Sequence, residues 1–139
     1  MITRIYTTKQ AVLDYDSSVH CVVFTCMDFM LPEEFKTILN VGLDFIRGKI
    51  NETGVMFWIS DATLSPVFNE EDTKWGIEDW TPRALAAGLR HVAFILPVEE
   101  LAVIGIDEYK EHGSHGMTVA YFKDVASAKK WFKELTAQA

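Results

Sequence analysis

The sequence predicts one α/β domain in which a mainly parallel sheet, opened by an antiparallel N-terminal hairpin, carries helices on its faces. Strand-like segments fill the first thirty residues, and helix-like and strand-like segments alternate from Pro32 onward. No linker, repeat or composition break interrupts the 139 residues. We therefore expect residues 1–139 to form a single domain, large enough to bury a core of its own.

The N-terminal segments have the patterns of strands. "ITRIYTT" alternates, "AVLDYD" follows, and "VHCVVFTC" is a nearly continuous apolar and β-branched run typical of a central strand. Asp16, Ser17 and Ser18 separate the last two segments and favour a turn. We expect these two strands to form a hairpin.

An amphipathic helix is predicted from Pro32, which suits the first helical position, with Glu33 and Glu34 at the positive helix end. Its apolar positions recur at i, i+3, i+4 and i+7. "NETG" closes this helix, and "VMFWIS" is the next buried strand. The apolar stripe comprises Phe35, Ile38, Leu39, Gly42, Leu43, Ile46 and Ile50.

A second helix is predicted from Asn69 to Gly88, which suits the residue after a helix C-terminus. Pro82 lacks an N–H, so the helix should kink there or restart with Thr81 as its N-cap. "HVAFILP" then reads as a third buried strand, "VEELAVIGIDEYKEHG" as a helix and "MTVAYFK" as a fourth parallel strand. "DVASAKKWFKEL" is a final helix, capped by Asp124.

Composition and charge exclude several function classes. Thirteen basic and twenty acidic residues give a net charge of −7, and no Lys/Arg cluster stands out, which argues against nucleic acid or anionic membrane as a partner. The apolar runs are too short or too interrupted for a transmembrane segment. No apolar signal region opens the chain, so a cytoplasmic protein is expected.

The two cysteines are expected to be core residues. Cys21 and Cys26 are five apart in a predicted strand, which places them on opposite faces and roughly 16 Å apart. They cannot form a disulfide within the chain, and their apolar surroundings favour packing over metal binding or catalysis.

Polar residues around the second predicted buried strand form the first candidate site. Ser60 and Asp61 end that strand, and Ser65 precedes Pro66 at a predicted helix start. Ligands of parallel α/β sheets bind beyond the carboxyl ends of the strands. The same residues also suit a strand end and a helix cap, and a cap explains Ser65 in most proteins.

Trp75 and Trp80 are five residues apart, which separates them by about 140° on an α-helix. They cannot face the same core surface unless the helix bends near Pro82. Two arrangements are open. Either one tryptophan is a core residue and the other lines a cleft or an interface, or both pack in the core, which is slightly favoured.

A metal-dependent phosphoacceptor is the weakest alternative. Asp28, Asp61 and Lys123 follow predicted strands, where carboxylates hold Mg²⁺ and a lysine neutralises a phosphoryl group. The ligand set is short, and turn and cap roles explain aspartates at such positions. His112 and His115 are three apart in a loop sequence, and no nucleophile is paired with a base. We expect no metal, no cofactor and no enzyme activity.

The chain resembles the SpoIIAA-like family, which is grouped with STAS and CRAL-TRIO-type domains. "DWTPRALAAG" with the following "VAFILP" is the most specific part, and "EEFKTILNVGLDFI" and "AYFKDVASAKKWF" extend the resemblance over almost the whole chain. The resemblance implies a domain that binds protein partners, or an apolar molecule as CRAL-TRIO-type relatives do. Ser65 is nearest to the serine that is phosphorylated in some STAS domains, but the bulky and acidic "LSPVFNEED" departs from that pattern, so this role is not transferred.

The sequence thus predicts a non-catalytic binding or regulatory interaction module. Its partner is a protein, or alternatively the domain carries a lipid or other apolar small molecule. A homodimer is one possible assembly for so apolar a small domain, on general grounds alone. The expected cleft comprises Ser60, Asp61, Ser65, Phe68, Trp75, Trp80 and Arg83.

Overall fold

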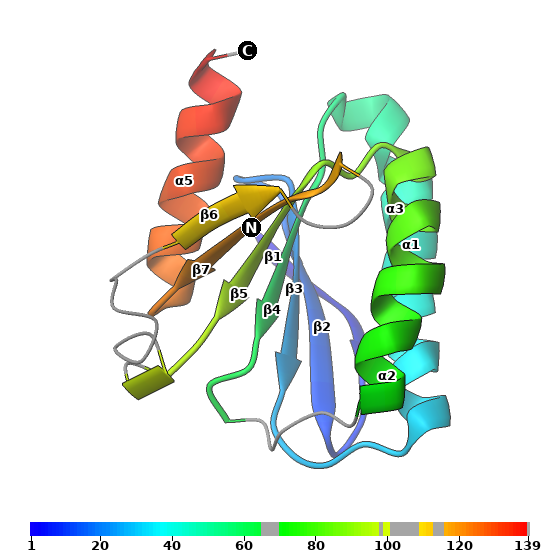
Figure 1. Cartoon of the computed structure of the whole chain (residues 1–139). Coiled ribbons are helices and arrows are strands. Elements are labelled where there is room, and N and C mark those ends of the chain that lie inside the picture. The colour runs from blue at the N-terminus through cyan, green and yellow to red at the C-terminus, as the bar shows by residue number, and fades with distance from the viewer. Residues whose placement is uncertain (65–69, 98, 101–108, 113–115, 139) are drawn as a thin grey trace.

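In a computed structural model of the whole chain, the described residues form one mixed sheet with helices on both faces (Figure 1). The structure describes residues 1–64, 70–97, 99–100, 109–112 and 116–138. Within these ranges the sheet has seven strands in the order β1-β2-β3-β4-β5-β7-β6. The neighbours β3, β4, β5 and β7 are parallel, whereas β1–β2, β2–β3 and β6–β7 are antiparallel pairs. The predicted α/β class and the antiparallel start of a mostly parallel sheet are therefore confirmed.

Strands and helices alternate through the middle of the chain, as the sequence indicates. The strands are β1 (Ile2–Thr7), β2 (Ala11–Asp16), β3 (Cys21–Cys26), β4 (Phe57–Asp61), β5 (His91–Ile95), β6 (Tyr109–His112) and β7 (Thr118–Phe122). The helices are α1 (Pro32–Thr53), α2 (Glu70–Trp75), the π-helical segment η1 (Gly76–Trp80), α3 (Thr81–Ala87) and α5 (Val125–Gln138).

The predicted turn at Asp16 joins β2 to β3. Oδ1 of Asp16 accepts hydrogen bonds from the backbone N–H of Ser18 (3.0 Å) and from its hydroxyl (2.6 Å). A short side-chain acceptor that binds the backbone two residues ahead stabilises such a turn. The expected hairpin is thus confirmed, with Ala11 opposite Cys26 and Asp16 opposite Cys21.

Helix α1 begins at Pro32 and ends where Gly54 adopts a left-handed conformation (φ 75°), as expected from "NETG". The carboxylate of Glu34 accepts a hydrogen bond from the backbone N–H of Leu31 (3.1 Å), which fixes the first turn. Six residues of the predicted stripe, Phe35, Ile38, Leu39, Gly42, Leu43 and Ile46, are buried. Among the described helices, α1 included, none is both long and apolar enough to cross a membrane.

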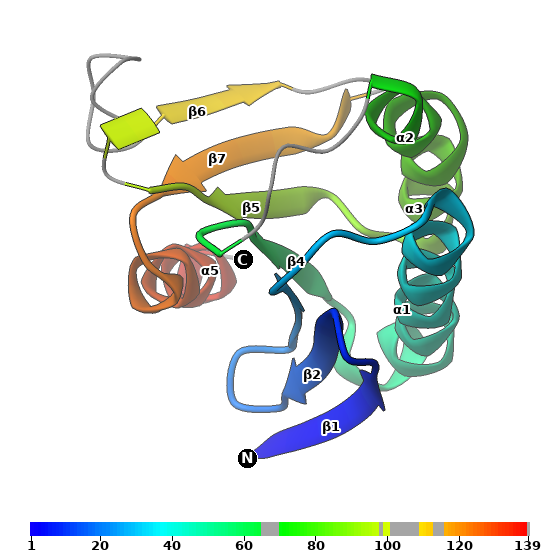
Figure 2. The same cartoon turned by 90° about the horizontal axis from the view of Figure 1, so that it is seen from below.

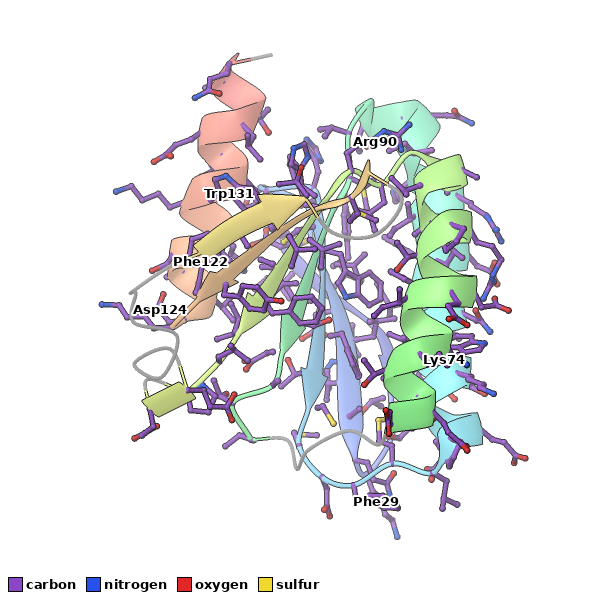
Figure 3. The ribbon with its side chains drawn as sticks, in the orientation of Figure 1. Phe29, Lys74, Arg90, Phe122, Asp124 and Trp131 are labelled. Carbon is purple, nitrogen blue, oxygen red and sulfur yellow. The ribbon has the colours of Figure 1, made fainter. Side chains whose placement is uncertain are left out.

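Two cores lie on opposite faces of the sheet. Helices α1, α2 and α3 cover one face, and α5 covers the other (Figure 2). Asp124 caps α5 as expected, because its Oδ1 accepts a hydrogen bond from the N–H of Ser127 (2.7 Å). On the α5 side, the rings of Trp131 and Phe122 lie 5.7 Å apart (Figure 3). Cys21 belongs to the α5 core and Cys26 to the other, so the expected opposite orientation and free state of the cysteines are confirmed.

One helix prediction is wrong in part. The segment "VEELAVIGIDEYKEHG" was expected to be helical throughout, but Tyr109–His112 is strand β6, paired antiparallel with β7. Tyr109 lies opposite Tyr121, and His112 lies opposite Thr118. Pairing with the open edge of β7 decides the conformation here, because tertiary context overrides a local preference in short segments. Residues 98, 101–108 and 113 of the expected helix lie outside the described part of the chain.

Candidate functional site

A cavity of about 440 Å³ lies between the sheet and the helices that cover its α1 face. Its wall comes from β3, β4, β5 and β7 on one side and from α1, α2, η1 and α3 on the other. Most of its lining is apolar or aromatic. The described lining residues are Phe24, Cys26, Phe35, Leu39, Trp58, Ser60, Asp61, Ala62, Asp72, Thr73, Gly76, Ile77, Trp80, Thr81, Val92, Phe94, Met117, Val119 and Tyr121.

The sheet side of the cavity is formed by residues that lie opposite one another on neighbouring strands. Phe24, Ser60, Phe94 and Tyr121 form one such row, because each is the register partner of the next. Side chains of one row point to the same face of a sheet. Ser60 is the smallest member of this row, so the wall recedes between its aromatic neighbours.

A hydrogen bond fixes the indole that borders this recess. Nε1 of Trp58 donates to the hydroxyl oxygen of Ser60 (2.8 Å), two residues farther along the same face of β4. The bond satisfies the only polar atom of a ring that is 1 % exposed. Ser60 therefore fixes the position of the Trp58 ring, and its small side chain leaves space on the sheet side of the cavity.

The helix side contains a π-helical segment, which the sequence did not predict. The backbone N–H of Thr81 bonds the carbonyl of Gly76, five residues earlier, and the Thr81 hydroxyl donates to the same oxygen (2.7 Å). Pro82 has no N–H to continue the α-helical pattern, which accounts for a break at this point. Thr81 is thus not the N-cap of a new helix: its backbone is helical, and its hydroxyl binds backward.

The π-helical segment changes the relation between Trp75 and Trp80. An i→i−5 hydrogen bond places residues five apart nearly above one another, so the 140° separation of an α-helix does not apply. Trp80 is buried, contacts the ring of Trp58 (5.0 Å between centroids) and donates its Nε1–H to the carbonyl of Leu39 (2.9 Å). Trp75 packs against Phe35 at the margin of the same core.

Trp75 and Arg83, both expected in the cleft, are not among the lining residues. The guanidinium of Arg83 and the ammonium of Lys36 each lie over the Trp75 ring, at 5.8 and 5.7 Å from its centroid. Arg83 also donates to Asp79 (2.9 Å) and to Asn40 of α1 (2.9 Å). These contacts tie α3 to α1 on the outer side of the helix layer.

Three expected site residues, Ser60, Asp61 and Trp80, line the cavity. Oδ1 of Asp61 accepts hydrogen bonds from the N–H (3.1 Å) and hydroxyl (2.7 Å) of Thr63, so this aspartate also forms a turn after β4. Ser65 and Phe68 lie outside the described residues.

The cavity opens to solvent at the start of the π-helical segment η1. Ile77 lines the cavity and yet is 44 % exposed, which places it at the opening. Gly76 lines the cavity beside it, and a Cβ built there would meet no heavy atom within 4 Å. A residue without a side chain therefore leaves this part of the helix wall thin.

The sequence did not single out most of the cavity wall. Phe24, Phe94 and Tyr121 belong to predicted strands, and Asp72 is one of three consecutive acidic residues in "EED". Only the alternation of apolar residues in four adjacent strands could have placed the three rings on one face. Asp72 is 3 % exposed and lines the cavity, and no pattern of spacing distinguishes it from Glu70 and Glu71.

Of the three residues considered for a phosphoacceptor site, Asp61 lines the cavity, whereas the other two lie at the surface. Asp28 and Lys123 are exposed, and Oδ1 of Asp28 accepts a hydrogen bond from the neighbouring N–H of Phe29 (2.7 Å). Within the described residues, no group of three or more His, Cys, Asp or Glu side chains is arranged to hold a metal ion. His115 lies outside those residues.

In comparisons with known proteins, no family model, no curated protein and no solved structure matches the chain.

Proposed function

We propose that this protein is a non-catalytic binding domain that holds an apolar small molecule in the cavity between its sheet and α1–α3. The observation that carries the proposal is the cavity itself. Its volume of about 440 Å³ is within the usual range of small-molecule sites, and its lining is mainly apolar and aromatic. The resemblance of "DWTPRALAAG" to the SpoIIAA-like family, which is grouped with STAS and CRAL-TRIO-type domains, supports the same class of ligand.

Three polar groups near the cavity are already hydrogen-bonded within the protein, which favours an apolar occupant. The indole N–H groups of Trp58 and Trp80 bind Ser60 and Leu39, and the hydroxyl of Thr81 binds Gly76. These groups therefore present carbon surface to the cavity rather than free donors. Burying apolar ligand surface against such a wall is favourable by roughly 25 cal/mol per Å².

The uncharged fluorescent probe N-phenyl-1-naphthylamine tests this proposal, because its emission rises in an apolar site. We expect saturable binding to the full chain. The substitution Val119→Phe places a larger ring on the cavity wall and should weaken the probe at least tenfold. Val12→Phe is the matched control, because Val12 is a half-buried strand residue that does not line the cavity.

Both variants should keep the native circular dichroism spectrum, which shows that they fold. Absence of saturable probe binding to the wild type would contradict the proposal. Equal probe affinity in Val119→Phe and Val12→Phe would place the bound probe elsewhere and contradict it as well.

A second candidate function is the binding of a protein partner, which a different surface favours. Phe29 and Leu31, in the segment between β3 and α1, are 58 % and 57 % exposed, and Phe29 lies at the lower edge of the molecule in Figure 3. Exposed large apolar side chains that lie close together are typical of interaction sites. A second copy of the chain would also suit such a surface.

The double substitution Phe29→Ser/Leu31→Ser tests this surface. Affinity capture from native lysate and sedimentation velocity of the purified chain should both be compared with the wild type. If the wild type is monomeric and captures no protein that the double variant fails to capture, this second function is wrong.

A further inference from the structure

Aromatic rings surround the cavity on both sides. The rings of Trp58 and Trp80 meet edge to face (5.0 Å), those of Phe94 and Tyr121 stack (5.8 Å), and that of Phe24 lies 6.4 Å from both Phe35 and Trp58. The faces of such rings carry partial negative charge. Aromatic side chains that line a cavity can turn such faces to a ligand, and aromatic cages bind organic ammonium groups in this way.

Carboxylates are the charged groups of this wall. Asp72 from α2 is 3 % exposed, and Asp61 lines the cavity at the end of β4. No Lys, Arg or His occurs among the described lining residues. Oδ2 of Asp61 receives no hydrogen bond from the described part of the chain, since both donors from Thr63 bind Oδ1. The charged groups of the cavity wall are therefore all negative within the described residues.

We propose that the ligand is an organic cation: an apolar amine or a quaternary ammonium compound whose charged nitrogen lies near Asp72 and Asp61. Its hydrocarbon part occupies the space between the aromatic rings. This inference rests on the proposed function, and it adds the charge class of the ligand. The net charge of −7 favours approach of a cation over an anion as well.

The same wall disfavours fatty acids, which an apolar cavity alone would accept. An anionic head group would lose its hydration and would lie beside carboxylates in a poorly solvated space. Like charges placed together in this way act against a ligand, which is how specificity between similar molecules arises.

Three ligands with one hydrocarbon chain test the charge class. Octyltrimethylammonium, 1-octanol and octanoate should each be titrated, below the concentrations at which they form micelles or a separate phase, against the full chain carrying N-phenyl-1-naphthylamine. We expect the cation to displace the probe at a concentration at least tenfold lower than octanol, and octanoate to be the weakest. Equal displacement by all three, or stronger displacement by octanoate, would overturn the charge class and leave an apolar site. If the probe and all three compounds fail to bind, with direct calorimetry as the check, both proposals are wrong.

Neutral variants of the two carboxylates locate the charge that selects the ligand. Asp72→Asn keeps the shape of the side chain and should reduce the preference for the cation over octanol at least tenfold, while octanol binds as before. Asp61→Asn, at a half-buried position, provides a second measurement if Asp72→Asn fails to fold. The control is Asp79→Asn, because Asp79 lies in the same helical stretch and does not line the cavity. An unchanged preference in both Asp72→Asn and Asp61→Asn would contradict the assignment.

Discussion

Gly42 of α1 lies so close to Trp58 of β4 that a Cβ on Gly42 would come within 2.5 Å of Cη2 and Cζ3 of the indole. Real carbon atoms do not approach so closely, so only glycine allows α1 to pack on this ring. Trp58 is fixed from its other end by the hydrogen bond to Ser60. The contact therefore determines how closely the helix layer approaches the sheet beside the cavity.

Gly42→Ala should consequently destabilise the protein, although alanine favours helices. We expect a loss of about 1–3 kcal/mol in the free energy of unfolding, because the ring of Trp58 must move from a well-packed position. Urea denaturation measures this loss. The matched control is Gly48→Ala in the same helix, where a Cβ meets nothing within 4 Å. That control should gain about 0.5–1 kcal/mol, and a similar gain in Gly42→Ala would show that the contact is not rigid.

The pair Asp16–Lys129 joins the β2–β3 turn to α5 and should contribute to stability. Nζ of Lys129 lies 2.7 Å from Oδ2 of Asp16, and the two side chains are 21 % and 8 % exposed. Asp16→Asn leaves the lysine without its partner and should cost about 2–3 kcal/mol, near the lower limit for buried pairs because Lys129 is partly solvated. Asp14→Asn, in the same strand, removes the more exposed pair with Arg4 and should cost about 1 kcal/mol or less.

The pH dependence of stability provides an independent measurement of the same pair. Burial raises the pKa of Asp16, but hydrogen bonds from Lys129 and Ser18 outweigh it and lower the pKa from 3.8 to about 2. Because the folded pKa is the lower one, its stabilisation is complete above pH 3.8 and is lost as the pH falls toward about 2. The difference in unfolding free energy between wild type and Asp16→Asn should shrink by about 2 kcal/mol over this window. A difference that is constant across the window would contradict the assigned pKa.

Cys21 should be inert toward thiol reagents in the folded protein. Burial raises the pKa of its thiol to about 12, so at pH 8 only about one molecule in ten thousand carries the reactive thiolate. In a Cys26→Ala variant, which leaves one thiol, labelling should follow the rate of global unfolding. Added urea below the unfolding transition serves as the control, and fast labelling without it would show that Cys21 is accessible.

The sequence predicted correctly those element ends that are fixed by one residue, such as a glycine after a helix or an aspartate cap. Gly54 and Gly88 end their helices in a left-handed conformation, and Asp124 caps α5, because these roles depend on few neighbouring residues. Strand Tyr109–His112 was missed because its conformation depends on β7, a partner that follows it in the chain. Pairing between segments cannot be read from the periodicity of one of them.

The candidate site was predictable at one strand end and at Trp80. Ser60 and Asp61 stood out because ligands bind beyond the carboxyl ends of parallel strands. Trp75 was grouped with Trp80 on sequence spacing, but Lys36 and Arg83 cover its ring on the outer side. The π-helical hydrogen bond at Gly76 has no sequence period of its own, so the α-helical angle between the two tryptophans could not apply.

The double contact of Thr81 with the Gly76 carbonyl gives a direct test of the π-helical segment. Thr81→Val removes the hydroxyl donor (2.7 Å) and keeps the branched shape, so we expect a loss of about 0.5–1.5 kcal/mol. Thr136→Val is the control, because its hydroxyl binds the Phe132 carbonyl (3.0 Å) in a regular turn of α5. Urea denaturation measures both losses of stability, and the affinity for N-phenyl-1-naphthylamine reports whether the cavity has changed.

Thr81→Val should also weaken binding of N-phenyl-1-naphthylamine, because Thr81 and Gly76 both line the cavity and the hydroxyl fixes the backbone there. Thr136→Val should leave probe affinity unchanged, since α5 lies on the other face of the sheet. If the two variants lose equal stability and bind the probe equally well, the extra hydrogen bond does not shape the cavity. A loss of affinity confined to Thr81→Val would instead connect the helix irregularity before Pro82 to ligand binding.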